Sequence, residues 1–323
     1  MAKKAYFCSV KVVVDDKIPY IRPYVEHMGE CIFLPGAAIT ASDVQDADVL
    51  IVRTRTRVNK ELLEGSRVSI VVTATIGYDH IDTDYLTRHG IRWTNCPGCN
   101  ARSVAQYIAG CLPSKPGRLG IVGCGHVGSA VRQMAITHGW EVRVSDPPLG
   151  LNDDLTDCDV ISFHVPLTTS GPCPTYHMAS ADFFTHLRRK PMIINAARGG
   201  VVDEEALLSA MDKGLVGPVV IDTWEHEPTP RPELLRRALY ATPHIAGYSA
   251  NGKATATWMT LRAIGAPNLP ASPTDLLREA LGGTIPYQPT YTPAADSQAL
   301  KTHPELFEHL RGHYPLRIEP AAL

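Results

Sequence analysis

The chain contains 323 residues, which is enough to bury a substantial core and favours two domains over one. Its 31 basic and 33 acidic residues nearly cancel, so no whole-molecule field draws it to nucleic acid or to an anionic membrane. Apolar runs stay well below the ~18 residues of a membrane span, and the N-terminal stretch lacks a secretory hydrophobic region. We therefore expect a soluble cytoplasmic protein that binds neither membranes nor nucleic acid.

Strand-forming and helix-forming patterns alternate from the beginning of the chain. The expected strands cover residues 10–14, 49–52, 70–73 and 91–94, and a helix is expected over 20–27. Residues 96–100 are rich in Pro and Gly, which is typical of a hinge, so a domain boundary is predicted near residue 98.

The same alternation resumes after this hinge. The expected helices cover 101–111, 127–138 and 204–212, and the expected strands cover 119–122, 141–144, 160–163, 192–195 and 219–222. Strands that alternate with helices in this way are typical of an α/β fold with a doubly wound parallel sheet. The tail after residue 264 is rich in Pro and polar residues, and one helix is expected there, over 304–311.

The eight cysteines are scattered beside apolar segments, which favours reduced core thiols over a disulfide framework. Cys96 and Cys99, separated by Pro and Gly, have the spacing of a redox or zinc motif. No second pair of this kind and no histidine pair accompanies them. We therefore predict no metal site, and a redox pair stays the weaker alternative.

A glycine-rich segment indicates where a dinucleotide binds. Gly123, Gly125 and Gly128, with His126 and Val127 between them, follow an expected strand and open an expected helix. Glycines let the backbone turn tightly and approach a pyrophosphate, which the amides at the helix N-terminus stabilise. The alternative is an ordinary glycine turn.

The next expected strand ends near Asp146, which indicates the kind of dinucleotide. A carboxylate at this place can accept hydrogen bonds from an adenosine ribose and would repel a 2'-phosphate. The sequence therefore favours NAD over NADP. A solvated aspartate at the end of a strand is the alternative.

Other strand ends carry residues suited to the rest of the cofactor, because ligands of such sheets bind outside the carboxyl ends of the strands. Val165 and Pro166 follow one expected strand and could flank the cofactor. Ala196 and Ala197 follow the next and leave room for a nicotinamide ring, whose carboxamide Asp222 could meet.

Three residues far apart in the sequence have the chemistry of hydroxy-acid oxidation. Arg198 can bind a substrate carboxylate in bidentate fashion. His244 can take the hydroxyl proton while hydride leaves the carbon, and Glu227 can orient the imidazole and favour its protonated form. An exposed turn arginine and a structural histidine are the alternatives for single residues, but their joint occurrence favours a 2-hydroxyacid dehydrogenase.

Seven segments carry a resemblance to a known family. They are VRTRTRVN (52–59), TATIGYDHID (73–82), NCPGCNA (95–101), SDPP (145–148), NAARGGVVD (195–203), DTWEHEP (222–228) and HIAGYSANGKA (244–254). With them the chain resembles the NAD-dependent D-2-hydroxyacid dehydrogenases, and most closely the branch that acts on 4-phospho-D-erythronate. The resemblance implies oxidation of that acid to (R)-3-hydroxy-2-oxo-4-phosphooxybutanoate in pyridoxal 5'-phosphate biosynthesis.

The resemblance also implies roles for individual residues. Arg198 and Glu227 become active-site residues and His244 the general acid and base. The substrate contacts that it implies are Thr54, Thr75 and Tyr248. The positions that match cofactor contacts of the family are Asp146, Val165, Ala196–Arg198, Asp222 and Gly247.

Two Rossmann-like domains are the expected architecture. Residues 1–98 form a flavodoxin-like substrate domain that acts as a lid, and residues 99–248 form the NAD domain. Residues 249–323 are expected to return to the substrate domain and to contribute to dimerisation, so the expected assembly is a homodimer.

Local chemistry is consistent with a phosphorylated substrate. Arg53, Arg55 and Arg57 alternate after an expected strand, so at a period of two they could present guanidinium groups on one face to a phosphate. A solvated basic edge is the alternative.

Some connections are short for the family. The stretch between Asp146 and Val160 barely suffices for a crossover between parallel strands, and the helix after Gly252 is expected to end early, at Gly265. Incomplete helical cover of the sheet would follow. The rival functions are another D-2-hydroxyacid dehydrogenase, such as a phosphoglycerate dehydrogenase, and an NAD-sensing binding protein of the corepressor type, whose peptide groove has no sequence signal.

Overall fold

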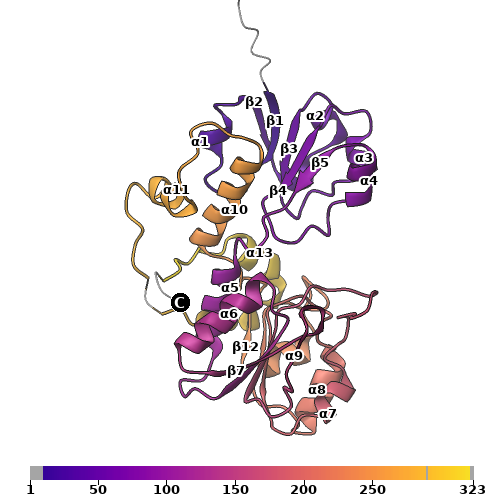
Figure 1. Ribbon diagram of the computed structural model, residues 1–323, viewed down its shortest axis with the longest axis vertical. Coiled ribbons are helices and arrows are strands. Elements are labelled where there is room, and N and C mark those ends of the chain that lie inside the picture. Colours follow the sequence, from indigo (N-terminus) through magenta and orange to yellow (C-terminus); the bar gives the residue numbers. More distant parts are fainter. Residues whose placement is uncertain (1–9, 289, 321–323) are drawn as a thin grey trace, which may run out of the picture. The chain divides into compact units, whose positions relative to one another are not determined.

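The computed structural model describes residues 10–288 and 290–320, and they divide into two compact units (Figure 1). The first unit combines residues 10–100 with Ala250–Pro286. The second combines Ala101–Ser249 with the described residues that follow Pro286. The expected return of the whole C-terminal segment to the first domain is therefore corrected, since the described residues after Pro286 belong to the second unit. The reason is that Leu300 and Phe307 are buried in the apolar core of that unit.

The first unit is built on a parallel sheet with the strand order β2-β1-β3-β4-β5, which is the flavodoxin order. Its strands are β1 Val10–Asp15, β2 Gly29–Leu34, β3 Val49–Val52, β4 Ile70–Thr73 and β5 Arg92–Thr94. All four residues of β3 are buried, as is usual for a parallel strand covered on both faces. Strand β2 was not predicted from the sequence, because it lies at the edge of the sheet and its side chains are only partly buried or exposed.

Helices cover both faces of this sheet (Figure 1). Those of the first unit are α1 Arg22–Val25, α2 Ala41–Val44, α3 Lys60–Leu63, α4 Thr83–Arg88, α10 Ala250–Ala263 and α11 Pro273–Ala280, with the 3₁₀ turn η1 Gly36–Ala38. The helix expected over 20–27 is shorter than predicted because Tyr20 has a φ of 64°, which is outside the helical region. Helix α11 was not predicted, although Ser272 caps it and Pro273 occupies its first turn.

The second unit is built on a sheet with the order β12-β11-β10-β9-β6-β7-β8, in which the neighbouring strands are parallel except for β7 and β8. The strands are β6 Arg118–Val122, β7 Glu141–Asp146, β8 Leu151–Asn152, β9 Val160–Phe163, β10 Met192–Asn195, β11 Val219–Ile221 and β12 Tyr240–Ala241. The chain runs from β6 outward to β7 on one side and to β9 on the other. This reversal makes the carboxyl end of β6 the topological switch point.

An apolar core lies on each face of this second sheet. Helices α5 Ala101–Cys111 and α6 His126–Thr137 contribute to one core. The other core receives residues from α7 Ala181–Thr185, α8 Glu204–Asp212, α9 Pro232–Arg237, α12 Ala294–Thr302 and α13 Phe307–Gly312. Helix α12 was not predicted, and the helix expected over 304–311 divides into the 3₁₀ turn η3 Pro304–Leu306 and α13.

The short connection from β7 to β9 crosses without an α-helix over the described residues 147–159. It contains the 3₁₀ turn η2 Pro147–Leu149 and the antiparallel strand β8. Gly120 makes this possible, because a Cβ there would lie 3.1 Å from Cys158 Sγ and 3.4 Å from a methyl carbon of Leu155. The connection thus packs directly on β6, and the expected reduction of helical cover is found here.

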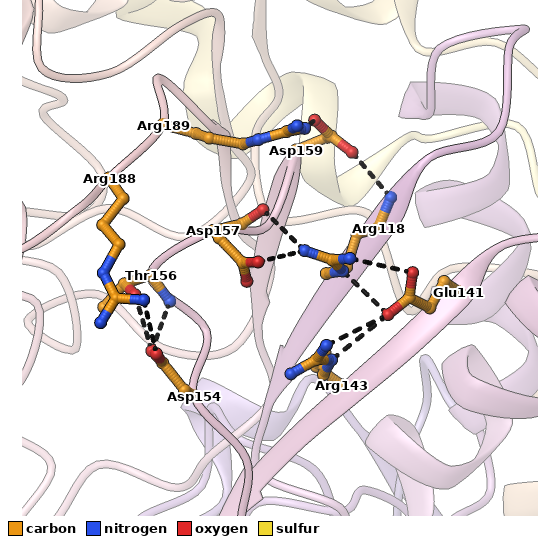
Figure 2. Close-up of polar contacts among 9 residues, drawn as sticks. All are labelled: Arg118, Glu141, Arg143, Asp154, Thr156, Asp157, Asp159, Arg188 and Arg189. Atoms are coloured by element: carbon orange, nitrogen blue, oxygen red, sulfur yellow. Dashed lines mark hydrogen bonds and ion pairs between the residues drawn. The ribbon is translucent and has the colours of Figure 1, made fainter.

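Alternating arginines and carboxylates join the amino ends of these strands (Figure 2). Arg118 begins β6, and its Nε lies 2.9 Å from Glu141 Oε1 at the start of β7. Its backbone N–H donates to Asp159 Oδ2 at 2.8 Å, just before β9. The four arginines of Figure 2 face four carboxylates, so the network satisfies its own charges. It lies at the edge of the sheet opposite the glycine-rich loop.

Candidate active site

The glycine-rich loop follows β6 at the switch point, and its shape requires glycine at two positions. Gly123 has a φ of 87°, and a Cβ there would lie 2.6 Å from Val165 Cγ1. A Cβ on Gly128 would lie 1.9 Å from the carbonyl oxygen of Gly123. Gly125 faces open space instead. The loop is therefore tightly packed at Gly123 and Gly128 and open at Gly125, the residue just before helix α6.

The N-terminus of α6 has the features of an anion site. Gly125 is its N-cap and supplies no side-chain acceptor, so no side chain caps the amides of the first turn. His126 is exposed and Val127 is half-buried at this end. Asp146, at the end of β7, accepts a hydrogen bond from Cys124 N at 2.6 Å. A tight loop, free helix amides and an adjacent carboxylate fit the pyrophosphate and ribose of a dinucleotide.

The strand ends beside this loop carry small or apolar groups. Val165 is half-buried against Gly123, and Pro166 is exposed. Ala197 is buried and Ala196 is half-buried at the end of β10. Their places at the carboxyl edge agree with the positions expected for a cofactor, and their contacts with it stay a prediction.

His164 contributes a buried polar group to the same edge. Its Nε2 lies 2.9 Å from Ser162 Oγ, while its Nδ1 is buried without a hydrogen-bond partner. Burial lowers the pKa of this imidazole to about 3, so the ring is neutral at physiological pH.

His244 and Glu227 form a hydrogen-bonded pair. His244 Nδ1 lies 3.0 Å from Glu227 Oε1 and 2.9 Å from Oε2. The side chains are only 26% and 21% exposed, so water screens their interaction weakly. His244 has a φ of 58°, a conformation that is fixed by the hydrogen bond from its N–H to Asp222 O at 2.8 Å. Glu227 is fixed by Trp224 N, which donates to Oε1 at 3.1 Å.

Several charges act on the Glu227 carboxyl. Burial by itself would raise its pKa, but the hydrogen bond and the charge of His244, the amide of Trp224 and the charge of Arg311 outweigh it. Together they hold the pKa of Glu227 below its ordinary value. An ionised carboxylate therefore contacts Nδ1 and leaves Nε2 of the same ring for a reacting proton.

Asp222 holds the loop that carries His244. Its fully buried carboxylate accepts hydrogen bonds from Thr242 Oγ1 at 2.6 Å, Ile245 N at 2.8 Å and Ala246 N at 3.0 Å. Burial raises its pKa, against the effect of these donors. Its proposed contact with a nicotinamide carboxamide stays a prediction, because the structure gives it three partners within the protein.

Arg198 follows β10, the neighbour of β11. Its Nη1 donates to the carbonyl oxygen of Ala197 at 2.8 Å. Gly199 packs against the turn that leads to Glu227, since a Cβ there would lie 1.8 Å from Trp224 O. The structure thus brings the backbone of the two segments together. Within the described residues, no hydrogen bond joins the Arg198 side chain to His244 or Glu227.

The C-terminal segment supplies residues that the sequence analysis missed. Arg311 Nη1 lies 3.6 Å from Glu227 Oε2, and Arg311 is also hydrogen-bonded to Tyr248. Arg317 is 2% exposed and donates to Ile245 O at 3.0 Å and to Ala246 O. Gly247, which follows, is half-buried. No local pattern indicated these contacts, because the arginines lie in a Pro-rich and polar tail.

The proposed substrate residues of the first unit lie at the carboxyl edge of its own sheet. Arg53 follows β3, and its Nε lies 3.3 Å from Oδ2 of the buried Asp15. Thr54 is exposed. Thr75 follows β4, the neighbour of β3, and its Oγ1 lies 2.7 Å from Thr73 Oγ1.

The expected common face of Arg53, Arg55 and Arg57 is corrected. The chain turns after β3, with Thr56 N bonded to Arg53 O at 3.2 Å, so a period of two does not apply. Arg55 and Arg57 are exposed, whereas Arg53 is half-buried beside Asp15.

Cys96 and Cys99 are both free thiols. Burial raises the pKa of Cys96 to about 11 and that of Cys99 to about 12, the opposite of a reactive redox pair. Among the described residues, no cluster of His, Cys, Asp or Glu has the geometry to hold a metal ion. None of the helices in that part of the chain is long and apolar enough to cross a membrane.

Comparison with known proteins gives consistent results. Residues 111–246 match the family model "D-isomer specific 2-hydroxyacid dehydrogenase, NAD binding domain". The chain is 47% identical to the erythronate-4-phosphate dehydrogenase of Bacteroides thetaiotaomicron, over 97% of this chain and 98% of that protein. It is 41% identical to the erythronate-4-phosphate dehydrogenase of Cellvibrio japonicus, over 96% and 93%. The crystal structure of NAD⁺-bound 3-phosphoglycerate dehydrogenase from Entamoeba histolytica superposes with a TM-score of 0.66 at 25% identity, covering 88% of this chain and 99% of that one.

Proposed function

The chain belongs to the erythronate-4-phosphate dehydrogenase family of the D-isomer specific 2-hydroxyacid dehydrogenases, and we propose that it oxidises 4-phospho-D-erythronate with NAD. The product is (R)-3-hydroxy-2-oxo-4-phosphooxybutanoate, on the route to pyridoxal 5'-phosphate. The observation that carries the proposal is the His244–Glu227 pair, with Nδ1 bonded to a carboxylate at the carboxyl edge of the NAD-binding sheet. A metabolic dehydrogenase needs such a base beside its cofactor.

In this proposal, different residues of the second unit transfer the proton, stabilise the imidazolium and bind the substrate carboxylate. Bound NAD would supply the acceptor for the hydride that leaves the carbon carrying the substrate hydroxyl. His244 takes the hydroxyl proton at Nε2, and Glu227 stabilises the imidazolium that forms. Arg198 binds the carboxylate of the acid and polarises the adjacent carbonyl as it develops. In the reverse direction His244 returns the proton.

The cofactor would be held by the loop and strand ends described above. The backbone of Gly123, Gly125 and Gly128 and the amides of α6 would face its pyrophosphate. Asp146 would accept hydrogen bonds from the adenosine ribose, which favours NAD over NADP because a 2'-phosphate would be repelled.

The substrate contacts proposed in the first unit are Arg53, Thr54 and Thr75, and Tyr248 is the one proposed in the second. A guanidinium suits a phosphate because it is permanently charged and donates several hydrogen bonds. The buried Asp15 supports this role for Arg53, since it holds the guanidinium in a defined position. We also propose that the protein is a homodimer located in the cytoplasm, which sedimentation of the purified protein and cell fractionation would test.

The test is NADH formation by the purified protein from 4-phospho-D-erythronate, with semicarbazide to trap the 2-oxo acid. Lactate and 3-phosphoglycerate serve as comparison substrates. The proposal predicts a kcat/KM for 4-phospho-D-erythronate far above both. Faster turnover of 3-phosphoglycerate would instead indicate a phosphoglycerate dehydrogenase.

The Arg53→Ala variant tests recognition of the phosphate. It should raise KM for 4-phospho-D-erythronate far more than KM for unphosphorylated erythronate. Equal changes in KM for the two substrates would show that Arg53 does not bind the phosphate.

A further inference from the structure

A cation from the C-terminal segment reaches the His244–Glu227 pair. Helix α13 carries Arg311, whose Nη1 lies 3.6 Å from Glu227 Oε2. The Arg311 side chain is 22% exposed, and it is hydrogen-bonded to Tyr248 as well. The Glu227 carboxylate therefore has two hydrogen-bond partners, His244 Nδ1 and Trp224 N, and forms an ion pair with Arg311 of the C-terminal segment.

Each oxygen of Glu227 contacts His244 and one further group. Oε1 accepts from Trp224 N at 3.1 Å and lies 3.0 Å from His244 Nδ1. Oε2 lies 2.9 Å from the same Nδ1 and 3.6 Å from Arg311 Nη1. A carboxylate held on both sides in this way cannot rotate away from the imidazole without losing a partner.

Other charged and aromatic side chains also lie around the cluster of His244, Glu227 and Arg311. Glu308, one turn earlier on α13, lies 4.0 Å from Arg311 Nη1. Asp222 interacts electrostatically with His244 from the end of β11. Tyr248 contacts the edge of the Tyr314 ring, with ring centroids 6.3 Å apart, besides its bond to Arg311.

We propose that Arg311 is a positioning residue of the catalytic pair, which holds the Glu227 carboxylate against His244 Nδ1 and fixes the hydroxyl of Tyr248. The inference rests on the proposed function, because that function assigns His244 and Glu227 their roles. A second consequence is electrostatic: a cation beside Glu227 offsets part of the carboxylate's pull on the imidazolium. Arg311 thereby keeps His244 able to release its proton and act again as a base.

This arrangement predicts opposite effects for two substitutions. Removing the charge of Arg311 leaves Glu227 to act on His244 alone, which favours the imidazolium and makes the ring a base only at higher pH. Because Arg311 contacts the carboxylate that contacts the ring, the acid limb of the kcat/KM profile for oxidation should rise by on the order of one pH unit. Removing the charge of Glu227 should move the same limb downward.

Arg311→Met, Arg311→Lys and Glu308→Gln are the variants to compare. Arg311→Met keeps most of the apolar stem of the side chain. It should lower kcat roughly tenfold and move the acid limb of the kcat/KM profile to higher pH. Arg311→Lys keeps the charge and should leave the limb in place, with a smaller loss of kcat. Glu308→Gln removes the other ion pair of Arg311 on the same helix and should behave like the parent protein.

A readout that needs no turnover separates this inference from the proposed function. The His244 ring is titrated by NMR in histidine-labelled protein, with His244→Gln to assign the signal. An upward shift of its midpoint in Arg311→Met supports the inference even if 4-phospho-D-erythronate is not the substrate. Unchanged titration and an unchanged pH profile in Arg311→Met would overturn it. Equal losses of kcat in Arg311→Met and Arg311→Lys, with a lowered Tm and no shift of the acid limb, would show that Arg311 has only a structural role. That result would also overturn the inference.

Discussion

Replacing Glu227 by Gln is the sharpest test of the catalytic pair. The substitution keeps the size of the side chain and an oxygen that can still accept from Trp224 N, which lies 3.1 Å from Oε1. It removes the negative charge that His244 Nδ1 contacts at 2.9 and 3.0 Å. The change is therefore confined to the charge that stabilises the imidazolium.

The size of the effect follows from the geometry. A hydrogen bond between charged groups contributes about 1.5–3 kcal/mol, and these side chains are less than a third exposed, so little of it is lost to screening. The neutral amide keeps part of the bond in the transition state. We therefore expect kcat to fall by about 10- to 100-fold, since about 1.4 kcal/mol corresponds to a factor of ten.

The assay is the pH dependence of kcat and kcat/KM for 4-phospho-D-erythronate, measured from NADH absorbance. The carboxylate favours the imidazolium, so its loss should move the acid limb of oxidation toward lower pH. Glu225→Gln is the matched control, because Glu225 lies in the same turn and contacts a different histidine, His177, at 2.6 Å. If Glu227→Gln keeps kcat within about twofold of the control and shows the same acid limb, the pair does not act as described.

Three further outcomes follow from the described contacts. Gly128→Ala places a Cβ 1.9 Å from Gly123 O, so it should lose about 1–3 kcal/mol of stability and most NADH binding by fluorescence titration, whereas Gly125→Ala, facing open space, should keep the parent Tm. Asp146→Ser should lower the kcat/KM ratio of NAD over NADP at least about fivefold, and an unchanged ratio would place the ribose elsewhere. Burial raises the pKa of Cys96 to about 11, so near pH 8 only about one thiol in a thousand is ionised there, and mass spectrometry should find iodoacetamide on the exposed Cys173 long before Cys96.

The sequence by itself determined the α/β alternation, the glycine-rich loop and the strand ends that precede Arg198 and Glu227, whereas the short strand β12 before His244 was not predicted. These features depend on local rules, because a glycine turn or a buried strand is specified within a few residues. Carboxyl ends of parallel strands meet at one edge of a sheet, so residues far apart in the chain could be assigned to one site before any coordinate was known.

Only the tertiary structure decided what surrounds that site. Leu300 and Phe307 are buried in the second unit, and their packing brings α13 and Arg311 to Glu227 across a long stretch of chain. The turn after β3 likewise removed the common face predicted for three arginines, because the chain leaves the extended conformation there and Thr56 Oγ1 donates to Gly36 O at 2.8 Å, in a distant segment. A partner that arrives from a Pro-rich, polar tail leaves no periodic signal, since its position depends on which apolar surfaces remain to be covered once the sheet has formed.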